Sequence, residues 1–206
     1  MLQAANPYVR PKPKAAETPP YPEGKYRCIV VDPPWPMEKW DRAVRPNQGA
    51  YLDYNTMTLD EIAAIPLGDL ADVGECQVYL WATHRFLPDA FKIFSAWGVN
   101  YHCLLTWVKP TGMTPMSWMF NTEFVLFGYI GRLNVLRKGL NVSFEAPVTK
   151  HSEKPDVFYD LVRQMSGEKR IDMFARREHE GFEGWGAESA RCGVSQEEAG
   201  RTSTQA

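Results

Sequence analysis

The sequence lacks several features that define large classes of protein. Its four cysteines, Cys28, Cys76, Cys103 and Cys192, form no CxxC pattern, which argues against a zinc site or a disulfide framework. It has no apolar run approaching about 18 residues and no signal-peptide pattern at its amino terminus, so no membrane segment is expected. We therefore predict a cytoplasmic protein with free, mostly buried thiols and no bound metal.

An excess of positive charge is also missing. The chain has 23 Lys and Arg residues against 25 Asp and Glu residues, a formal net charge of −2, which is not the footprint of a strongly basic nucleic-acid-binding protein. Any nucleic acid must therefore be bound by local basic groups. Three such groups are Lys39, Arg42 and Arg45; Arg132, Arg137 and Lys138; and Arg176 with Arg177. Each of these residues, taken alone, is equally consistent with an ordinary solvated charge.

Apolar residues are plentiful. Hydrophobic residues make up 44% of the 206 residues and aromatic residues 13%, which is ample for the core of a single domain. The composition divides the chain into a proline-rich arm over residues 1–24, a catalytic domain over 25–188 and a polar tail over 189–206. The arm and the tail contain few aliphatic residues, so both are expected to be loosely attached.

Hydrophobic periodicity predicts strands alternating with helices. The expected strands are 26–31, 77–82, 101–108, 122–129 and 170–175, with a shorter extended piece at 141–144. Helices are expected to begin at Thr58, near Phe86 and at Pro155, and loops to cover 36–53 and 111–121. This alternation predicts an α/β fold, a mostly parallel twisted sheet with helices on both faces, with ligands bound beyond the carboxyl ends of the strands.

The most informative stretch is Asp32-Pro33-Pro34-Trp35, which ends an apolar run. Two consecutive prolines stiffen the backbone and lack N–H donors. A carboxylate beside the Pro33 carbonyl makes two fixed acceptors, which suit a ligand with two hydrogens on one nitrogen, such as an exocyclic amine. The indole of Trp35 can stack on the ring that carries this amine. The same residues are also consistent with a strand terminator whose tryptophan caps the core.

This tetrapeptide resembles the motif of the DPPW family of adenine-N6 methyltransferases. The family includes the catalytic subunit of the enzyme that methylates messenger-RNA adenosine, and many bacterial and phage DNA methyltransferases. Further stretches resemble the family in the same order, at residues 54–57, 106–109, 151–156 and 170–176, the last followed by Trp185 and Gly186. The resemblance implies a Rossmann-like methyltransferase fold and S-adenosylmethionine as the cofactor.

The resemblance also implies the roles of the residues in the DPPW motif. Asp32 and the Pro33 carbonyl would each accept an N6 hydrogen of adenine, which turns the nitrogen lone pair towards the methyl group. Trp35, after the second proline Pro34, would stack on the adenine. Tyr54 and Lys109 would shape the wall of the base pocket. No metal is required.

The carboxy-terminal motifs are assigned to the cofactor by the same resemblance. Lys154 would meet the methionine carboxylate, and Arg176 and His179 the ribose or adenine end, with Glu188 as a further ribose candidate. The full set of expected cofactor residues is Asp32, Ser152, Lys154, Phe174, Arg176, His179 and Glu188. The sequence departs from the family at Ala187, where members commonly carry an asparagine, so a hydrogen-bonding amide is missing.

The compactness of the chain resembles the bacterial and phage members, so DNA is the expected methyl acceptor and RNA adenine the alternative. A duplex adenine would have to be flipped out of the stack, with Lys39, Arg42 and Arg45 near the phosphate backbone. A non-catalytic nucleic-acid-binding subunit is the competing interpretation, and the intact DPPW motif and Lys154 favour activity. A homo-oligomer and a complex with a partner subunit are both compatible with the sequence.

Overall fold

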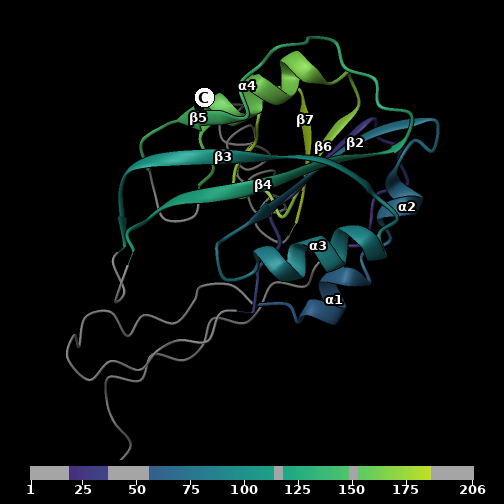
Figure 1. The fold of residues 1–206 in the computed structure, drawn as a ribbon. Coiled ribbons are helices and arrows are strands. Elements are labelled where there is room, and N and C mark those ends of the chain that lie inside the picture. Colours follow the sequence, from purple (N-terminus) through teal and green to yellow (C-terminus); the bar gives the residue numbers. More distant parts are fainter. Residues whose placement is uncertain (1–18, 37–55, 114–117, 149–152, 187–206) are drawn as a thin grey trace, which may run out of the picture.

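A seven-stranded sheet forms the centre of the molecule. The computed structural model describes residues 19–36, 56–113, 118–148 and 153–186 (Figure 1). The strands are β1 (Cys28–Val31), β2 (Glu75–Ala82), β3 (Asn100–Met113), β4 (Phe120–Gly131), β5 (Ser143–Glu145), β6 (Arg170–Met173) and β7 (Phe182–Trp185). Their order is β5-β3-β4-β2-β1-β6-β7. Only β4 pairs antiparallel, with β2 and β3, so the expected mostly parallel sheet is confirmed.

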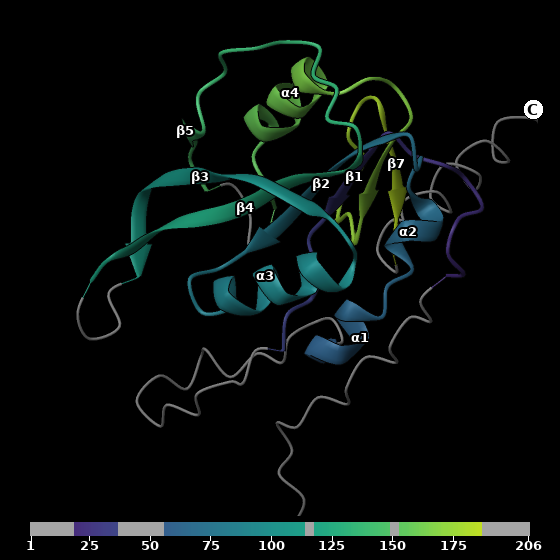
Figure 2. The ribbon, with the colours of Figure 1, turned by 45° about the vertical axis from the view of Figure 1, so that its right-hand side comes forward.

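Helices cover both faces of this sheet, as expected. They are α1 (Leu59–Ala63), α2 (Leu67–Leu70), α3 (Leu87–Ala96) and α4 (Asp156–Met165). Figures 1 and 2 show α4 over one face and α1 and α3 over the other. Each face buries its own apolar cluster, with Ile62 and Phe94 in the cluster beneath α1 and α3, and Trp81 and Phe158 in the cluster beneath α4.

Local signals in the sequence set the helix ends. Thr58 caps α1 in a capping box, in which its hydroxyl accepts from the Glu61 N–H and the Glu61 carboxylate accepts from the Thr58 N–H. Pro155 immediately precedes α4. Gly98 follows α3 with a φ of +68°, a left-handed conformation that glycine adopts without steric cost. These ends agree with the sequence prediction.

The loop predicted over residues 111–121 is wrong at its two ends, and residues 114–117 within it lie outside the described part of the chain. β3 continues through Pro110 to Met113, and β4 begins at Phe120, so the two strands form a long hairpin. The proline is tolerated because β5 pairs with β3 only from Thr106 to Val108, and the pairing with β4 shifts register beyond Val108. The short elements α2 and β7 were not predicted. Residues 37–55, most of the other predicted loop, lie outside the described part of the chain.

The end of the proline-rich arm packs against β7. The indole Nε1 of Trp185 donates to the Pro20 carbonyl at 2.9 Å, and the Tyr21 ring stacks on the same indole with a centroid separation of 4.8 Å. Residues 19–24 are therefore attached to the domain, contrary to the expectation for the arm.

Cys28, Cys76 and Cys103 are free thiols, and Cys192 lies outside the described residues. Within the described ranges, no three His, Cys, Asp or Glu side chains come together as metal ligands. Across those same ranges, none of the helices combines the length and apolar character that a transmembrane helix needs.

Candidate active site

Polar side chains continue an apolar row on the face of the sheet that α4 covers. Side chains alternate between the two faces along a strand. Val30 of β1, Trp107 of β3 and Val125 of β4 all belong to the cluster beneath α4. Two positions further along on the same face lie Asp32 after β1 and Lys109 on β3. The alternation therefore brings these two polar residues to the rim of the apolar cluster.

Glu123 completes this rim from β4. It lies two positions before Val125 and opposite Trp107 in the β3–β4 register. Because β4 runs antiparallel to β2, with Phe124 opposite Ala82, the first residues of β4 lie beside the carboxyl end of β2. The Glu123 carboxylate therefore lies near the carboxyl ends of the parallel strands, where α/β sheets bind their ligands.

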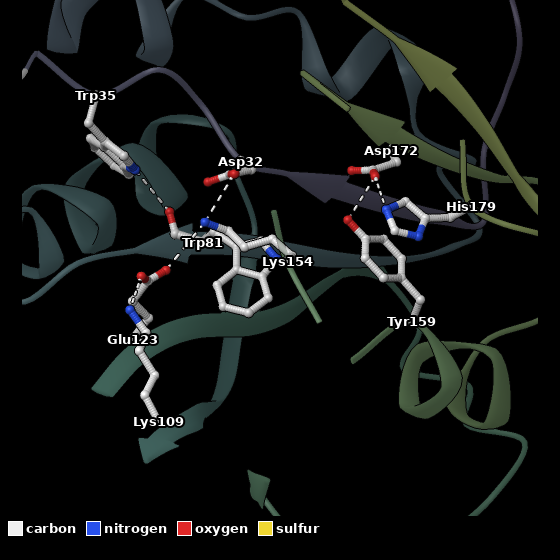
Figure 3. A network of polar contacts seen from close by, with 9 residues as sticks. All are labelled: Asp32, Trp35, Trp81, Lys109, Glu123, Lys154, Tyr159, Asp172 and His179. Carbon is white, nitrogen blue, oxygen red and sulfur yellow. Dashed lines mark hydrogen bonds and ion pairs between the residues drawn. The ribbon is translucent and has the colours of Figure 1, made fainter. Parts of the chain in front are cut away.

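Lys154, just before α4, joins these side chains into one network (Figure 3). Its Nζ lies 3.1 Å from Oδ2 of Asp32 and 3.3 Å from Oε2 of Glu123. The other Glu123 oxygen, Oε1, forms an ion pair with Lys109. The Lys154 ammonium also lies 4.8 Å from the centroid of the Trp81 ring, a cation–π contact. Two carboxylates and two ammonium groups thus alternate across the ends of the central strands.

The electrostatic environment makes Asp32 the more basic of the two carboxylates. Burial raises the pKa of Asp32, and Lys154 lowers it only in part. Burial also tends to raise the pKa of Glu123, but the positive charges of Lys154 and Lys109 outweigh it and the pKa is lowered. Burial disfavours the charge of Lys154, but the carboxylates of Asp32 and Glu123 outweigh this effect and raise the pKa of Lys154. Lys154 is therefore a stable cation.

Hydrogen bonds fix the backbone of the two prolines. The Trp35 N–H donates to the Pro33 carbonyl at 2.8 Å, and the Met57 N–H donates to the Pro34 carbonyl at 2.8 Å. A carbonyl oxygen has two lone pairs, so the Pro33 carbonyl can still accept a hydrogen from a ligand. The Asp32 N–H donates to the Met173 carbonyl at 3.3 Å, which attaches the start of the turn to β6.

Trp35 lies in the core, which corrects its expected place against the substrate. Its side chain is 6% exposed and stacks on Phe86 with a centroid separation of 5.1 Å. Its Nε1 donates to the Trp81 carbonyl at 3.1 Å. Burying the indole against Phe86 removes a large apolar area from water, which an exposed stacking position would not. For this residue the alternative of a capping tryptophan is the one the structure supports.

Trp35→Ala is therefore expected to destabilise the fold. Removing a buried aromatic side chain costs about 3–5 kcal/mol of unfolding free energy. Trp35→Phe keeps most of the packing and loses the hydrogen bond to the Trp81 carbonyl, so we expect a smaller loss of about 1 kcal/mol. Urea unfolding of the three proteins measures both values. An alanine variant as stable as the parent but with weaker substrate binding would contradict the assignment of Trp35 to the core.

A second polar group lies on the other side of Asp32 (Figure 3). Asp172 of β6 lies opposite Val30 of β1 and accepts a hydrogen bond from the Tyr159 hydroxyl of α4 at 2.9 Å. The His179 ring stacks on the Tyr159 ring with a centroid separation of 3.4 Å, and its Nε2 lies 3.9 Å from Oδ2 of Asp172. Burial raises the pKa of Asp172 to about 7, whereas burial and the positive charge of Arg177 lower the pKa of His179 to about 4. The imidazole is thus neutral at pH 7, and its contact with Asp172 is not an ion pair.

The raised pKa of Asp172 predicts a pH dependence of stability. In the unfolded chain this carboxyl has its usual pKa of 3.8, so the folded state binds the extra proton between that value and about 7. Its contribution to stability is complete below about pH 3.8 and is lost as the pH rises through 7. Asp172→Asn removes this titration but keeps an acceptor for Tyr159. We expect the unfolding free energy of the variant to rise relative to the parent between pH 5 and pH 8.

Urea unfolding at several pH values tests this prediction. His179 acts in the opposite direction, since its lowered pKa contributes stability above pH 6.5 that is lost as the pH falls through about 4. This effect is common to the parent and to Asp172→Asn, so the difference between them isolates the carboxyl. A difference that does not change with pH would show that Asp172 is ionised in the folded protein across this range.

A cleft joins the two polar groups. It is lined by Asp32, Glu153, Lys154, Tyr159, Asp172, Phe174, Ala175, Arg176, Arg177 and His179. Phe174, at the end of β6, has a φ of +66°, a left-handed conformation that costs a bulky residue about 1–3 kcal/mol and is found most often at functional sites. Its N–H donates to the Trp185 carbonyl at 2.6 Å, so the adjoining strand stabilises this backbone.

The structure brings together most of the predicted residues that it describes. Asp32 and Lys154 line the cleft with Phe174, Arg176 and His179. Lys109 does not line it and instead pairs with Glu123, its ammonium 4.7 Å from the centroid of the Trp107 ring. Six predicted residues lie outside the described part of the chain, namely Lys39, Arg42, Arg45, Tyr54, Ser152 and Glu188.

Sequence reasoning missed Glu123, Asp172 and Tyr159. Glu123 and Asp172 are single acidic residues inside apolar strands, an uncommon placement that was itself a usable signal. Tyr159 falls within the apolar face of α4, where a core tyrosine is the ordinary interpretation. Because side chains alternate between the two faces of a sheet, Glu123 and Asp172 could have been assigned to the same face as Asp32. This assignment required the order of the strands to be known.

Comparison with known proteins shows relatives along most of this chain. A family model described as MT-A70 matches residues 26–188. The type II methyltransferase M.MunI of Mycoplasma sp. is 26% identical over 188 residues, which cover 82% of this chain and 80% of that protein. A putative N(6)-adenosine-methyltransferase MT-A70-like of Medicago truncatula is 28% identical over 173 residues, which cover 79% of this chain and 26% of that protein.

The N(6)-adenine-specific methyltransferase METTL4 of Mus musculus is 23% identical over 186 residues, which cover 79% of this chain and 37% of that protein. The chain thus spans most of the length of M.MunI, but only a minor part of the plant and mouse relatives.

Proposed function

Since this chain belongs to the MT-A70 family, we propose that it transfers a methyl group from S-adenosylmethionine to the N6 amine of adenine in nucleic acid. The observation that carries this proposal is the position of Asp32 and Pro33. They directly follow β1, an interior strand of the sheet; Asp32 lines the cleft together with Lys154, and the Pro33 carbonyl is the next backbone acceptor along the chain. Both acceptors are fixed in place before any ligand binds.

The two acceptors contribute to catalysis by positioning the N6 amine. Asp32 and the Pro33 carbonyl each accept one N6 hydrogen, which orients the nitrogen lone pair towards the methyl donor. S-adenosylmethionine would supply the methyl carbon for the new carbon–nitrogen bond, and its sulfur would keep the electron pair of the broken carbon–sulfur bond. One N6 proton then leaves to Asp32, whose raised pKa favours proton uptake, and passes to solvent.

The cleft has the chemistry that S-adenosylmethionine requires. When bound, this cofactor supplies an activated methyl group on a sulfonium. The Lys154 ammonium is proposed to bind a carboxylate, and the Arg176 guanidinium, which also lines the cleft, to donate hydrogen bonds. Asp172 and His179 provide a polar surface for hydroxyl groups, and Phe174 an apolar one. Ser152 and Glu188, outside the described residues, are proposed to complete this site.

We propose DNA as the methyl acceptor and RNA as the second candidate. DNA is favoured because the chain covers most of a type II methyltransferase, whereas it covers a minor part of the adenosine methyltransferase-like relative. The Medicago truncatula relative supports RNA as the second candidate acceptor, because its name specifies adenosine. Lys39, Arg42 and Arg45 are proposed to contact phosphates, and Tyr54 to contact the base, from their positions in the sequence next to the DPPW motif.

Methyl transfer from labelled S-adenosylmethionine tests the proposal. The acceptors are single- and double-stranded DNA and RNA of matched sequence, with and without adenine. Label is expected in DNA that contains adenine and not in DNA that lacks it. Transfer to RNA alone would replace the proposed acceptor. The absence of S-adenosylmethionine binding by calorimetry would instead indicate a non-catalytic subunit.

A further inference from the structure

We propose that Glu123 is a positioning residue for methyl transfer, acting through Lys154 and Lys109 to keep Asp32 available as an acceptor. The inference rests on the proposed function, because it concerns the same site. Glu123 lies outside every stretch of sequence that pointed to that function. Glu123 lies in the site because of the way β4 pairs with β2 and β3.

Both oxygens of Glu123 have a cationic partner. Oε2 lies 3.3 Å from Nζ of Lys154, and Oε1 pairs with Lys109. The side chain is 19% exposed, and those of Lys154 and Lys109 are 12% and 16% exposed, so solvent screens these contacts weakly. A carboxylate whose only role was to stabilise the hairpin would need Lys109 alone. The second contact, to Lys154, connects Glu123 to Asp32.

Lys154 has three partners that divide its positive charge. Its Nζ lies between Asp32 at 3.1 Å and Glu123 at 3.3 Å, above the face of the Trp81 ring. Because the two carboxylates compete for one ammonium group, neither binds it completely. Asp32 therefore keeps acceptor capacity for the amine hydrogen of a substrate.

Removing the Glu123 charge should change this balance in one direction. Lys154 would pair with Asp32 alone, and the attraction would be stronger because the competing carboxylate is gone. In addition, Glu123 is a like charge that raises the pKa of Asp32, so its loss lowers that pKa. Both effects make Asp32 a weaker hydrogen-bond acceptor and a weaker proton acceptor.

Glu123→Gln tests the proposal, since it keeps the shape of the side chain and removes its charge. We expect kcat to fall by about tenfold to a hundredfold, the size of the loss found when a residue that orients a metal ligand is removed. The acidic limb of the pH profile of kcat should move to lower pH. Lys109→Met gives the opposite change, because Glu123 then competes more strongly for Lys154, and the acidic limb should move to higher pH.

Glu168→Gln is the matched control. Glu168 is an exposed residue just before the amino end of β6, whereas Asp32 follows the carboxyl end of the parallel strand β1. The same substitution at Glu168 should therefore leave kcat and its pH profile unchanged. Thermal unfolding of each variant measures how far the fold is retained. If Glu123→Gln lowers stability and activity together without moving the pH profile, Glu123 is structural and the proposal is overturned.

A measurement that does not depend on activity separates this proposal from the proposed function. NMR of the Asp32 carboxyl carbon follows its titration in the parent and in Glu123→Gln. A lower pKa of Asp32 in the variant supports the coupling, even if the parent methylates no nucleic acid, and that second result would overturn the proposed function alone. An unchanged pKa of Asp32 in the variant would overturn the coupling, whatever the activity of the parent.

Discussion

Asp32→Ala is expected to lower the rate of methyl transfer by about a hundredfold to a thousandfold, the loss typical of removing one fixed electrostatic partner from an active site. The variant loses an acceptor for the N6 hydrogen and the group that takes up the released proton. Single-turnover transfer from labelled S-adenosylmethionine measures the rate of the chemical step. Because Asp32 lies beyond the end of β1, at the rim of the apolar cluster, the core strands should remain packed.

Asp32→Asn separates the geometric role of this residue from its charge. The amide oxygen still accepts a hydrogen bond, but it cannot take up a proton at neutral pH. We expect a rate between those of the parent and Asp32→Ala. Circular dichroism and S-adenosylmethionine binding establish that both variants are folded. Near-normal transfer by a folded Asp32→Ala protein would remove Asp32 from the reaction.

Lys154→Met should affect cofactor binding, catalysis and stability together. The methionine side chain has a similar length but no charge, so Asp32 and Glu123, whose side chains are 21% and 19% exposed, lose their shared cation. Removing one partner of a buried ion pair costs about 3–5 kcal/mol of unfolding free energy. The dissociation constant for S-adenosylmethionine should rise, since the proposed partner of its carboxylate is lost. Calorimetry and urea unfolding measure the two effects.

The double variant Lys154→Met with Glu123→Gln provides the control for stability. It removes one charge of each sign, so it should regain part of the unfolding free energy lost in Lys154→Met. Affinity for S-adenosylmethionine should stay low in both variants. If nucleic-acid affinity falls in Lys154→Met and cofactor affinity does not, the cofactor lies elsewhere.

Features encoded in a few adjacent residues could be predicted from the sequence. The capping box of Thr58 and Glu61, and Gly98 after α3, are local devices whose geometry depends on neighbouring residues only. The placement of Asp32 at a strand end followed from the apolar run that it terminates. Each of these predictions needed no knowledge of the strand order.

Features that depend on strand order could not be predicted. Glu123 shares Lys154 with Asp32 because β4 is inserted antiparallel beside β2, and Asp172 lies opposite Val30, two residues before Asp32, because β6 pairs with β1. Trp35 was assigned to the substrate because an indole can stack on a base or on Phe86 equally well. The strand over residues 101–108 was predicted to end before Pro110, but β3 continues through this proline, which lies where β3 no longer pairs with β5 and the cost of a missing N–H is small.

Identification of the methylated nucleoside decides whether the Asp32–Pro33 site acts on adenine. DNA is incubated with the protein and S-adenosylmethionine carrying a deuterated methyl group, digested to nucleosides and analysed by mass spectrometry against authentic standards. We expect the label in N6-methyladenine, and no label after incubation with Asp32→Ala. Label in N4-methylcytosine or 5-methylcytosine, or equal label with Asp32→Ala, would contradict adenine-N6 transfer at this site.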